Sequence, residues 1–213
     1  MDSISLTHLA LTARRYWPMH IASGDSAAGF RIGGAPPVGV TPEHPKEWTQ
    51  YFGTFPISIG NGKAQEMSIF CSFNYDDPDD PCFITDHIYK ALVGDVVQCV
   101  FHSPARRAKE SQFRSELDAY RVEIGKDVAD DFADESGGAP HQIGGVPFFQ
   151  DEHPRVRKTS ADLFEMGYLY ALRWSFPGGG DCAVRGNWPF HNYSFHVYLK
   201  MTDQGFDYRA MLV

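Results

Sequence analysis

Two Glu-His-Pro triplets are the first places in this sequence where reactive side chains recur. They occupy residues 43–45 and 152–154, and each follows an Ile-Gly-Gly-x-Pro stretch, at residues 32–36 and 143–147. A carboxylate beside an imidazole can ligate a metal ion or transfer protons. If the copies are related by a pseudo-twofold axis, these side chains would converge on one ion: Glu43, His44, Glu152 and His153. The competing expectation is that each histidine only caps its own loop through a backbone hydrogen bond.

Two acidic segments suggest a different chemistry, the binding of a basic partner. The first is a proline-flanked loop with four carboxylates: Asp76, Asp77, Asp79 and Asp80. The second, residues 127–135, has five acids and no base: Asp127, Asp130, Asp131, Asp134 and Glu135. The first loop lacks the glycine and the distal glutamate of an EF-hand calcium loop, which favours a solvated acidic turn over a metal site.

Three further motifs resemble reactive sites but lack a necessary part. Gly24-Asp25-Ser26 resembles a serine-hydrolase nucleophile turn, yet no oxyanion-hole glycines follow it and no G-x-S-x-G motif occurs in the chain. Residues 155–158, Arg-Val-Arg-Lys, are predicted to form a basic loop without the Gly-rich turn of a phosphate site. Glycines 178–180 are predicted to form a turn. We therefore expect no cofactor.

The charge and composition narrow the class of partner. The chain has 19 basic and 27 acidic residues and a formal net charge of −8, which argues against nucleic-acid binding. The first eight residues lack the basic and apolar regions of a signal peptide, and no apolar run is long enough to span a bilayer. The four cysteines are not spaced as metal or redox pairs. These features predict a reduced, cytoplasmic protein without a membrane partner.

Residue periodicity predicts mainly strands. The tight Asn-Gly sequence within residues 60–62 indicates a hairpin between strands at 51–59 and 66–73. Helical spacing of apolar residues predicts helices over 4–16 and 105–123. The other predicted extended segments are 93–101, 141–150, 167–176 and 193–201. Most of the many aromatic residues are expected in the core, and some of them in a binding groove.

The predicted fold class is α+β, a strand-rich single domain with few helices. Two pseudo-repeated halves, about 1–126 and 140–213, would form one antiparallel sheet and would be joined by the acidic segment 127–139. An internal repeat constrains the whole architecture, because each copy must present the same backbone corners.

The repeated motifs also carry a family resemblance. Residues 30–37, Phe-Arg-Ile-Gly-Gly-Ala-Pro-Pro, and 141–147, His-Gln-Ile-Gly-Gly-Val-Pro, with Gln150 following, resemble the YwqG-like bacterial proteins, a domain of unknown function. The resemblance touches both halves between about residues 30 and 200. It departs from the family at Trp48, which stands where a tryptophan-rich run is usual, and at residues 187–190, Asn-Trp-Pro-Phe. It implies a single YwqG-like α+β domain without established enzyme activity, in a group whose genes often lie beside bacterial toxin and immunity genes.

Together these features lead to one functional expectation and one alternative. The first is a non-catalytic cytoplasmic immunity protein that neutralises a cognate, basic bacterial toxin by occluding its active site. The acidic segment 127–135 or the loop 76–80 would supply the charge of the binding surface, and exposed aromatic residues would be its anchors. The alternative is an enzyme of unknown reaction that binds a small molecule or a metal between the two halves, through the Glu-His pairs.

Overall fold

The computed structural model describes residues 3–5, 9–10, 15–26, 29–58, 64–87, 93–129, 141–147, 154–175, 177, 181–190 and 193–213. Nearly all of these residues belong to, or connect, the strands of one 12-stranded sheet. The strands are β1 (Ile4–Ser5), β2 (Arg15–Ala22), β3 (Arg31–Ile32), β4 (Gln50–Ser58), β5 (Ala64–Cys71), β6 (Val97–His102), β7 (Tyr120–Ile124), β8 (Val128–Ala129), β9 (Gln142–Gly144), β10 (Leu169–Trp174), β11 (Phe195–Thr202) and β12 (Gly205–Leu212). A 3₁₀ turn, η1 (Ile84–His87), and one longer helix, α2 (Pro154–Glu165), complete the described elements.

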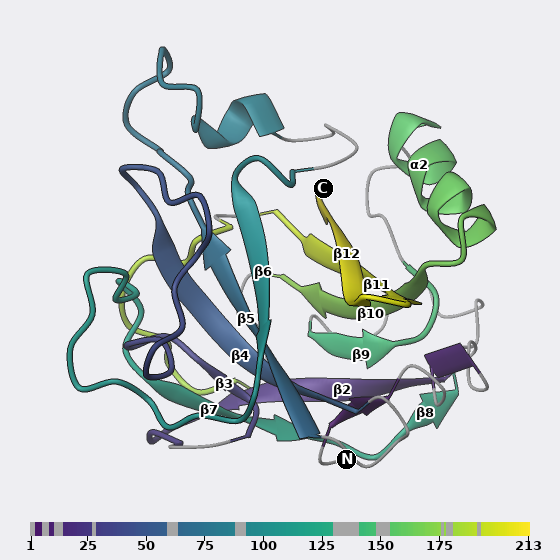
Figure 1. Ribbon diagram of the computed structural model, residues 1–213, viewed down its shortest axis with the longest axis horizontal. Coiled ribbons are helices and arrows are strands. Elements are labelled where there is room, and N and C mark those ends of the chain that lie inside the picture. The colour runs from purple at the N-terminus through teal and green to yellow at the C-terminus, as the bar shows by residue number, and fades with distance from the viewer. Residues whose placement is uncertain are drawn as a thin grey trace.

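The sheet curls until its two end strands approach each other (Figure 1). Its order is β12-β11-β10-β9-β2-β7-β3-β4-β5-β6, with β1 beside β4 and β8 beside β2. The ends meet where Val93 N donates a 3.0 Å hydrogen bond to Ala210 O and where Phe101 stacks on Phe206. The strand-rich α+β prediction is confirmed.

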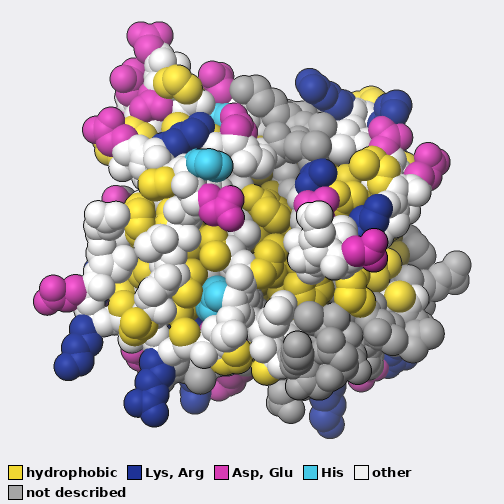
Figure 2. All heavy atoms as spheres, in the orientation of Figure 1, with side chains coloured by type: hydrophobic (Ala, Val, Ile, Leu, Met, Phe, Trp, Pro, Cys, Tyr) yellow, Lys and Arg dark blue, Asp and Glu magenta, His cyan; other side chains and the backbone are white. Residues whose placement is uncertain are grey.

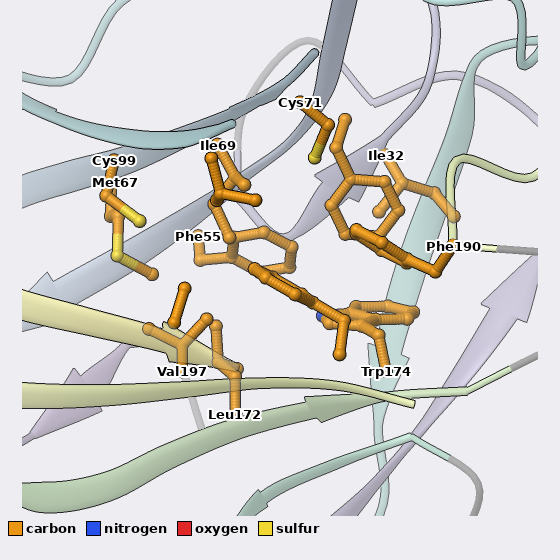
Figure 3. Packing of buried hydrophobic residues seen from close by; sticks show 14 of the residues in the cluster. Ile32, Phe55, Met67, Ile69, Cys71, Cys99, Leu172, Trp174, Phe190 and Val197 are labelled. Carbon is orange, nitrogen blue, oxygen red and sulfur yellow. The ribbon is translucent and has the colours of Figure 1, made fainter. Parts of the chain in front are cut away.

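Both halves of the chain contribute to one apolar core inside the curled sheet. In Figure 3, Phe55 and Ile69 from β4 and β5 point toward Trp174 and Val197 from β10 and β11. All four side chains are completely buried. Because the same cluster draws on strands on either side of β2 and β7, neither half can bury its apolar face alone.

The two Ile-Gly-Gly stretches form matching corners in the sheet. β3 lies between β7 and β4, and β9 lies between β2 and β10. Each of the two strands leads into two glycines with positive φ, at 33–34 and at 144–145. The next strand then has one extra residue relative to its partner, between Tyr51 and Gly53 in β4 and between Tyr170 and Leu172 in β10. These correspondences fit the duplication proposed from sequence. The pairing of β2 does not follow the two halves. This strand precedes the first Ile-Gly-Gly motif, but it pairs with β9, which belongs to the second motif.

The basic stretch at residues 155–158 is helical, so the loop prediction is wrong. Pro154 suits the first helical position, and Val156, Ser160 and Leu163 form the buried face of α2. The helix ends at Glu165 and is followed by Gly167, with φ +84°, in a Schellman arrangement where Tyr168 N donates to Leu163 O. α2 thereby covers the outer face of β10 and β11 at the right of Figure 1.

The helix predicted over 105–123 is also wrong. The hydroxyls of Ser111 and Ser115 accept hydrogen bonds from the N–H groups two residues further on, and this local bonding competes with a helix. The backbone then pairs at long range, because Gly34 N donates to Leu117 O at 2.9 Å. The segment is therefore irregular until β7 begins at Tyr120.

The remaining predicted elements mostly form. β4 and β5 make the predicted hairpin, with Ser58 opposite Ala64, while its turn lies outside the described residues. β6, β10 and β11 lie within or overlap the strands predicted at 93–101, 167–176 and 193–201. The N-terminal helix predicted over 4–16 is wrong at both ends, since β1 begins at Ile4 and β2 at Arg15 and only residues 9–10 are described as helical.

Candidate functional site

A cleft of about 1060 Å³ opens beside the ends of β4 and β5, and this volume is at the upper end of the range for ligand pockets. Residues from four separate segments line it, together with Pro177: residues 47–50, residues 73–76, Arg114 and Glu116, and residues 181–184 with 186–188. None of these segments is adjacent to another in sequence. The cleft therefore depends on the long-range pairing of the sheet.

The described part of the connection between β10 and β11 supplies one wall of the cleft, through Pro177 and residues within 181–188. Its counterpart in the first half, between β4 and β5, spans only residues 59–63. The longer connection crosses to the other half, where Cys182 N donates to Ile21 O at 2.8 Å and Asp118 N donates to Arg185 O at 3.1 Å. The cleft thus forms where the two halves differ.

A buried histidine-aspartate pair anchors this wall. Asp181 Oδ2 lies 3.1 Å from His141 Nε2, and Asp181 Oδ1 accepts a 2.8 Å hydrogen bond from Ile21 N. The imidazole packs on Trp174, with ring centroids 4.6 Å apart, and its Nδ1 accepts a hydrogen bond from Ser175 N. Since both side chains are 2% exposed or less, the pair positions the start of the wall and does not present a reactive group to the cleft.

The predicted acidic loop at residues 76–80 forms one rim of the cleft. Asp80 accepts hydrogen bonds from Asn74 Nδ2 at 2.9 Å, Cys82 N at 2.6 Å and Trp48 Nε1 at 2.7 Å. These bonds, the Asn74 bond first, lower the pKa of Asp80 to about 2. Asn74 Oδ1 in turn accepts from Asp76 N at 2.9 Å. The loop is thereby a fixed acidic surface, visible at the upper left of Figure 2.

Trp48 is the exposed aromatic residue of this site. Its side chain is 45% exposed, although most of the predicted aromatic cluster is buried, as expected. The bond to Asp80 holds its indole N–H and leaves part of the ring open to solvent. Tyr75, Phe73 and Trp188 also line the cleft, and Trp188 is 7% exposed. This combination of a fixed, open indole and buried rings is typical of a site that anchors a ligand.

The cleft carries a net negative charge. Among the described lining residues there are three exposed carboxylates, Glu47, Asp76 and Glu116, and one guanidinium, that of Arg114. Asp181 also lines the cleft, but its carboxylate is buried against His141. The carboxylates of the adjoining loop add to the same potential, so a cationic ligand is favoured at this face.

The second predicted acidic segment contributes less to the described surface. Asp127 Oδ2 forms a 2.7 Å ion pair with Arg15 Nε at the start of β2, which neutralises it locally. The other predicted residues of this segment lie outside the described residues: Asp130, Asp131, Asp134 and Glu135.

The convergence of the two Glu-His pairs on one ion stays a prediction. The loop of His44 is fixed to β6, since Gln98 accepts from His44 N at 3.0 Å and donates to His44 O at 2.6 Å. Glu152 and His153 lie outside the described residues. Among the residues that are described, no three His, Cys, Asp or Glu side chains are grouped as a metal site would need.

One pair that the sequence motifs did not indicate resembles part of a hydrolase site. Ser68 Oγ lies 2.8 Å from His102 Nε2, while His102 Nδ1 lies 2.8 Å from Ser103 O. Ser68 is completely buried between β4 and β6, however, and its hydroxyl also bonds Thr54 Oγ1 at 2.8 Å. A substrate cannot reach this serine, so the contact stabilises the sheet.

The described part of the chain contains no helix that is both long and apolar enough to span a membrane. Comparison of the chain with protein-family models, with curated proteins and with solved structures finds no match.

Proposed function

We propose that this chain is a non-catalytic, cytoplasmic binding protein that uses the cleft and the acidic loop at 76–80 to hold a basic surface of another protein. The observation that carries the proposal is the cleft itself, which combines a fixed, half-exposed indole with an excess of carboxylates. Aromatic anchors supply most of the affinity at protein interfaces, and complementary charge supplies fast association.

The partner that fits this surface best is a cognate bacterial toxin with a basic active site. Toxins that cleave or bind nucleic acid need cationic sites, and an acidic protein that covers such a site blocks the substrate. The net charge of −8 supports steering toward such a partner. The resemblance to YwqG-like proteins, which often accompany toxin and immunity genes, supports the same role as an immunity protein.

Co-expression with the product of each flanking gene, after each product has been screened alone for toxicity, tests the proposal. Wild-type protein is expected to restore growth, and a variant with Asp76, Asp77 and Asp79 changed to Asn is expected to protect much less. The purified complex should weaken by at least tenfold as salt rises from low to high concentration, because exposed charges are screened. A salt-insensitive complex, or full protection by a variant with both acidic segments neutralised, contradicts the proposal.

A further inference from the structure

The volume and the lining of the cleft indicate a more specific ligand than a basic protein surface in general. At about 1060 Å³ the cleft exceeds one side chain and accommodates a short stretch of polypeptide. We infer that it receives an extended segment of the partner that presents an arginine, whose guanidinium stacks on Trp48 and pairs with Glu47 or Asp76. This inference rests on the proposed function, because the segment belongs to the partner protein.

The surroundings of Trp48 favour a cation on the indole face. Its N–H is already bonded to Asp80, so a ligand meets the ring and not the donor. Glu47 is its chain neighbour, and Asp76 is tied to the same structure through Asn74. A cation above the ring is therefore attracted both by the π face and by nearby carboxylates.

Arginine fits this combination better than lysine. A planar guanidinium stacks on an indole and still directs N–H groups from its edge to a carboxylate. A lysine ammonium is a compact, strongly hydrated charge that lacks this flat face. One open ring in the same cleft as two exposed carboxylates, Glu47 and Asp76, therefore favours the guanidinium.

Trp188 supplies a second and independent observation. This residue lines the cleft and is 7% exposed, and its buried indole N–H has no hydrogen-bond partner among the described residues. An unsatisfied buried donor costs free energy, and a ligand that gains access to this N–H and brings an acceptor would offset that cost. The carbonyl groups of an extended polypeptide are such acceptors, whereas a simple polyamine has none.

Short synthetic peptides test the occupant directly. An arginine peptide is compared by titration calorimetry with the same sequence carrying lysine or the neutral isostere citrulline, and spermine serves as the polyamine probe. We expect the arginine peptide to bind at least tenfold more tightly than the lysine peptide and the citrulline peptide not to bind. Equal binding of the arginine and lysine peptides, or full competition by equimolar spermine, overturns the inference.

Variants of the protein locate the contact. Trp48→Ala is expected to weaken arginine-peptide binding about tenfold or more, and Asp76→Asn severalfold. Asp203→Asn, which changes an exposed carboxylate in the β11–β12 turn outside the cleft lining, is the matched control and is expected to bind within about twofold of wild type. Both cleft residues are exposed, so these variants should fold. Unchanged binding by Trp48→Ala contradicts the placement.

The two proposals fail in distinguishable ways. If no arginine peptide binds but the folded toxin does so in a salt-dependent manner, the segment inference is wrong and the proposed function stands. If arginine peptides bind through Trp48 but the toxin is neither bound nor neutralised, the cleft serves another arginine-bearing partner and the proposed function is wrong.

Discussion

Gly33 and Gly144 occupy the same backbone corner in the two halves of the sheet, with φ angles of +67° and +70°. Each follows an isoleucine that is completely buried, Ile32 or Ile143. Their surroundings differ. A Cβ atom on Gly33 would lie 1.8 Å from the backbone oxygen of Asp118, whereas one on Gly144 would first meet the side-chain tip of Leu9 at 2.7 Å.

The first prediction uses this difference. Both Gly→Ala changes carry the cost of a positive φ, about 1 kcal/mol, since L-residues disfavour that region. Gly33→Ala must also displace a backbone carbonyl, while in Gly144→Ala the side chain of Leu9 can rotate away from the added methyl group. We therefore expect Gly33→Ala to destabilise the protein clearly more than Gly144→Ala, as measured by urea unfolding. An equal loss in both variants would show that the Gly33 loop moves freely.

The second prediction concerns the buried ion pair of Arg31 and Glu66. The two side chains are 0% and 4% exposed, and their atoms meet at 3.1 and 3.2 Å. Glu66→Gln leaves a buried guanidinium without its counter-charge and is expected to cost about 3–5 kcal/mol of unfolding free energy. The double variant Arg31→Met, Glu66→Leu should lose less than the sum of the single changes, because it leaves neither charge behind.

An exposed ion pair provides the control for that experiment. Arg15 and Asp127 meet at 2.7 Å with side chains 45% and 44% exposed. Arg15→Ala is expected to change the unfolding free energy by less than about 1 kcal/mol. A loss as large as that of Glu66→Gln would mean that solvent exposure does not govern the difference.

The third prediction is a pH dependence from His196. Burial first, and then the charge of Arg173, lowers the pKa of His196 to about 3 from its usual 6.5. The native side chain stays neutral, with Nδ1 2.9 Å from the Tyr170 hydroxyl. Below pH 6.5 His196 becomes protonated in the unfolded chain, whereas in the native state it stays neutral down to about pH 3. Stability should therefore fall across this window, by about tenfold in the unfolding constant per pH unit.

His196→Gln isolates this contribution. Glutamine cannot titrate, so the variant is expected to be less stable at pH 7 but to show a flatter decline between about pH 6.5 and pH 4. Urea unfolding at several pH values measures the slope. An unchanged slope would assign the acid sensitivity to other groups.

The sequence predicts the parts of this fold that are set locally. β4 and β5 are recognisable because an alternating pattern and an Asn-Gly turn lie within a few residues of each other. β2 is missed although Trp17, Met19 and Ile21 alternate as its buried face. The helical spacing of apolar residues over 4–16 predicts a helix there instead, and a proline is unusual inside a strand. In the structure Pro18 lies within the strand and its carbonyl accepts a hydrogen bond from Gly125 N.

The candidate site is less predictable because it has no local signature. The acidic loop at 76–80 was identified from its composition, but its contact with Trp48 joins residues 32 positions apart in sequence. The opposite wall depends on Asp181, which is held by Ile21 N and His141. Only the assembled sheet brings these segments together around one cleft, so no local sequence pattern predicts the cleft.

The fourth prediction tests whether the acidic rim is fixed as the structure indicates. Hydrogen bonds from Asn74, Cys82 and Trp48 lower the pKa of Asp80 to about 2. The ionised carboxylate therefore stabilises the folded protein above the ordinary carboxyl pKa of 3.8, and this contribution is lost as pH falls through about 2. A carboxyl NMR titration should therefore give a midpoint near 2 in the wild-type protein. Asn74→Ala removes the largest of these bonds and should raise the midpoint toward 3.8.

Trp48→Phe is the companion variant for that titration. It keeps an aromatic ring on the rim and removes only the N–H that bonds Asp80, so a smaller rise in the pKa of Asp80 is expected than with Asn74→Ala. Near-UV circular dichroism at neutral pH checks that both variants remain folded, which matters because Asn74 is buried. A midpoint near 3.8 already in the wild-type protein would mean that the loop does not hold Asp80. The open indole of Trp48 would then lack the fixed orientation on which arginine selectivity depends.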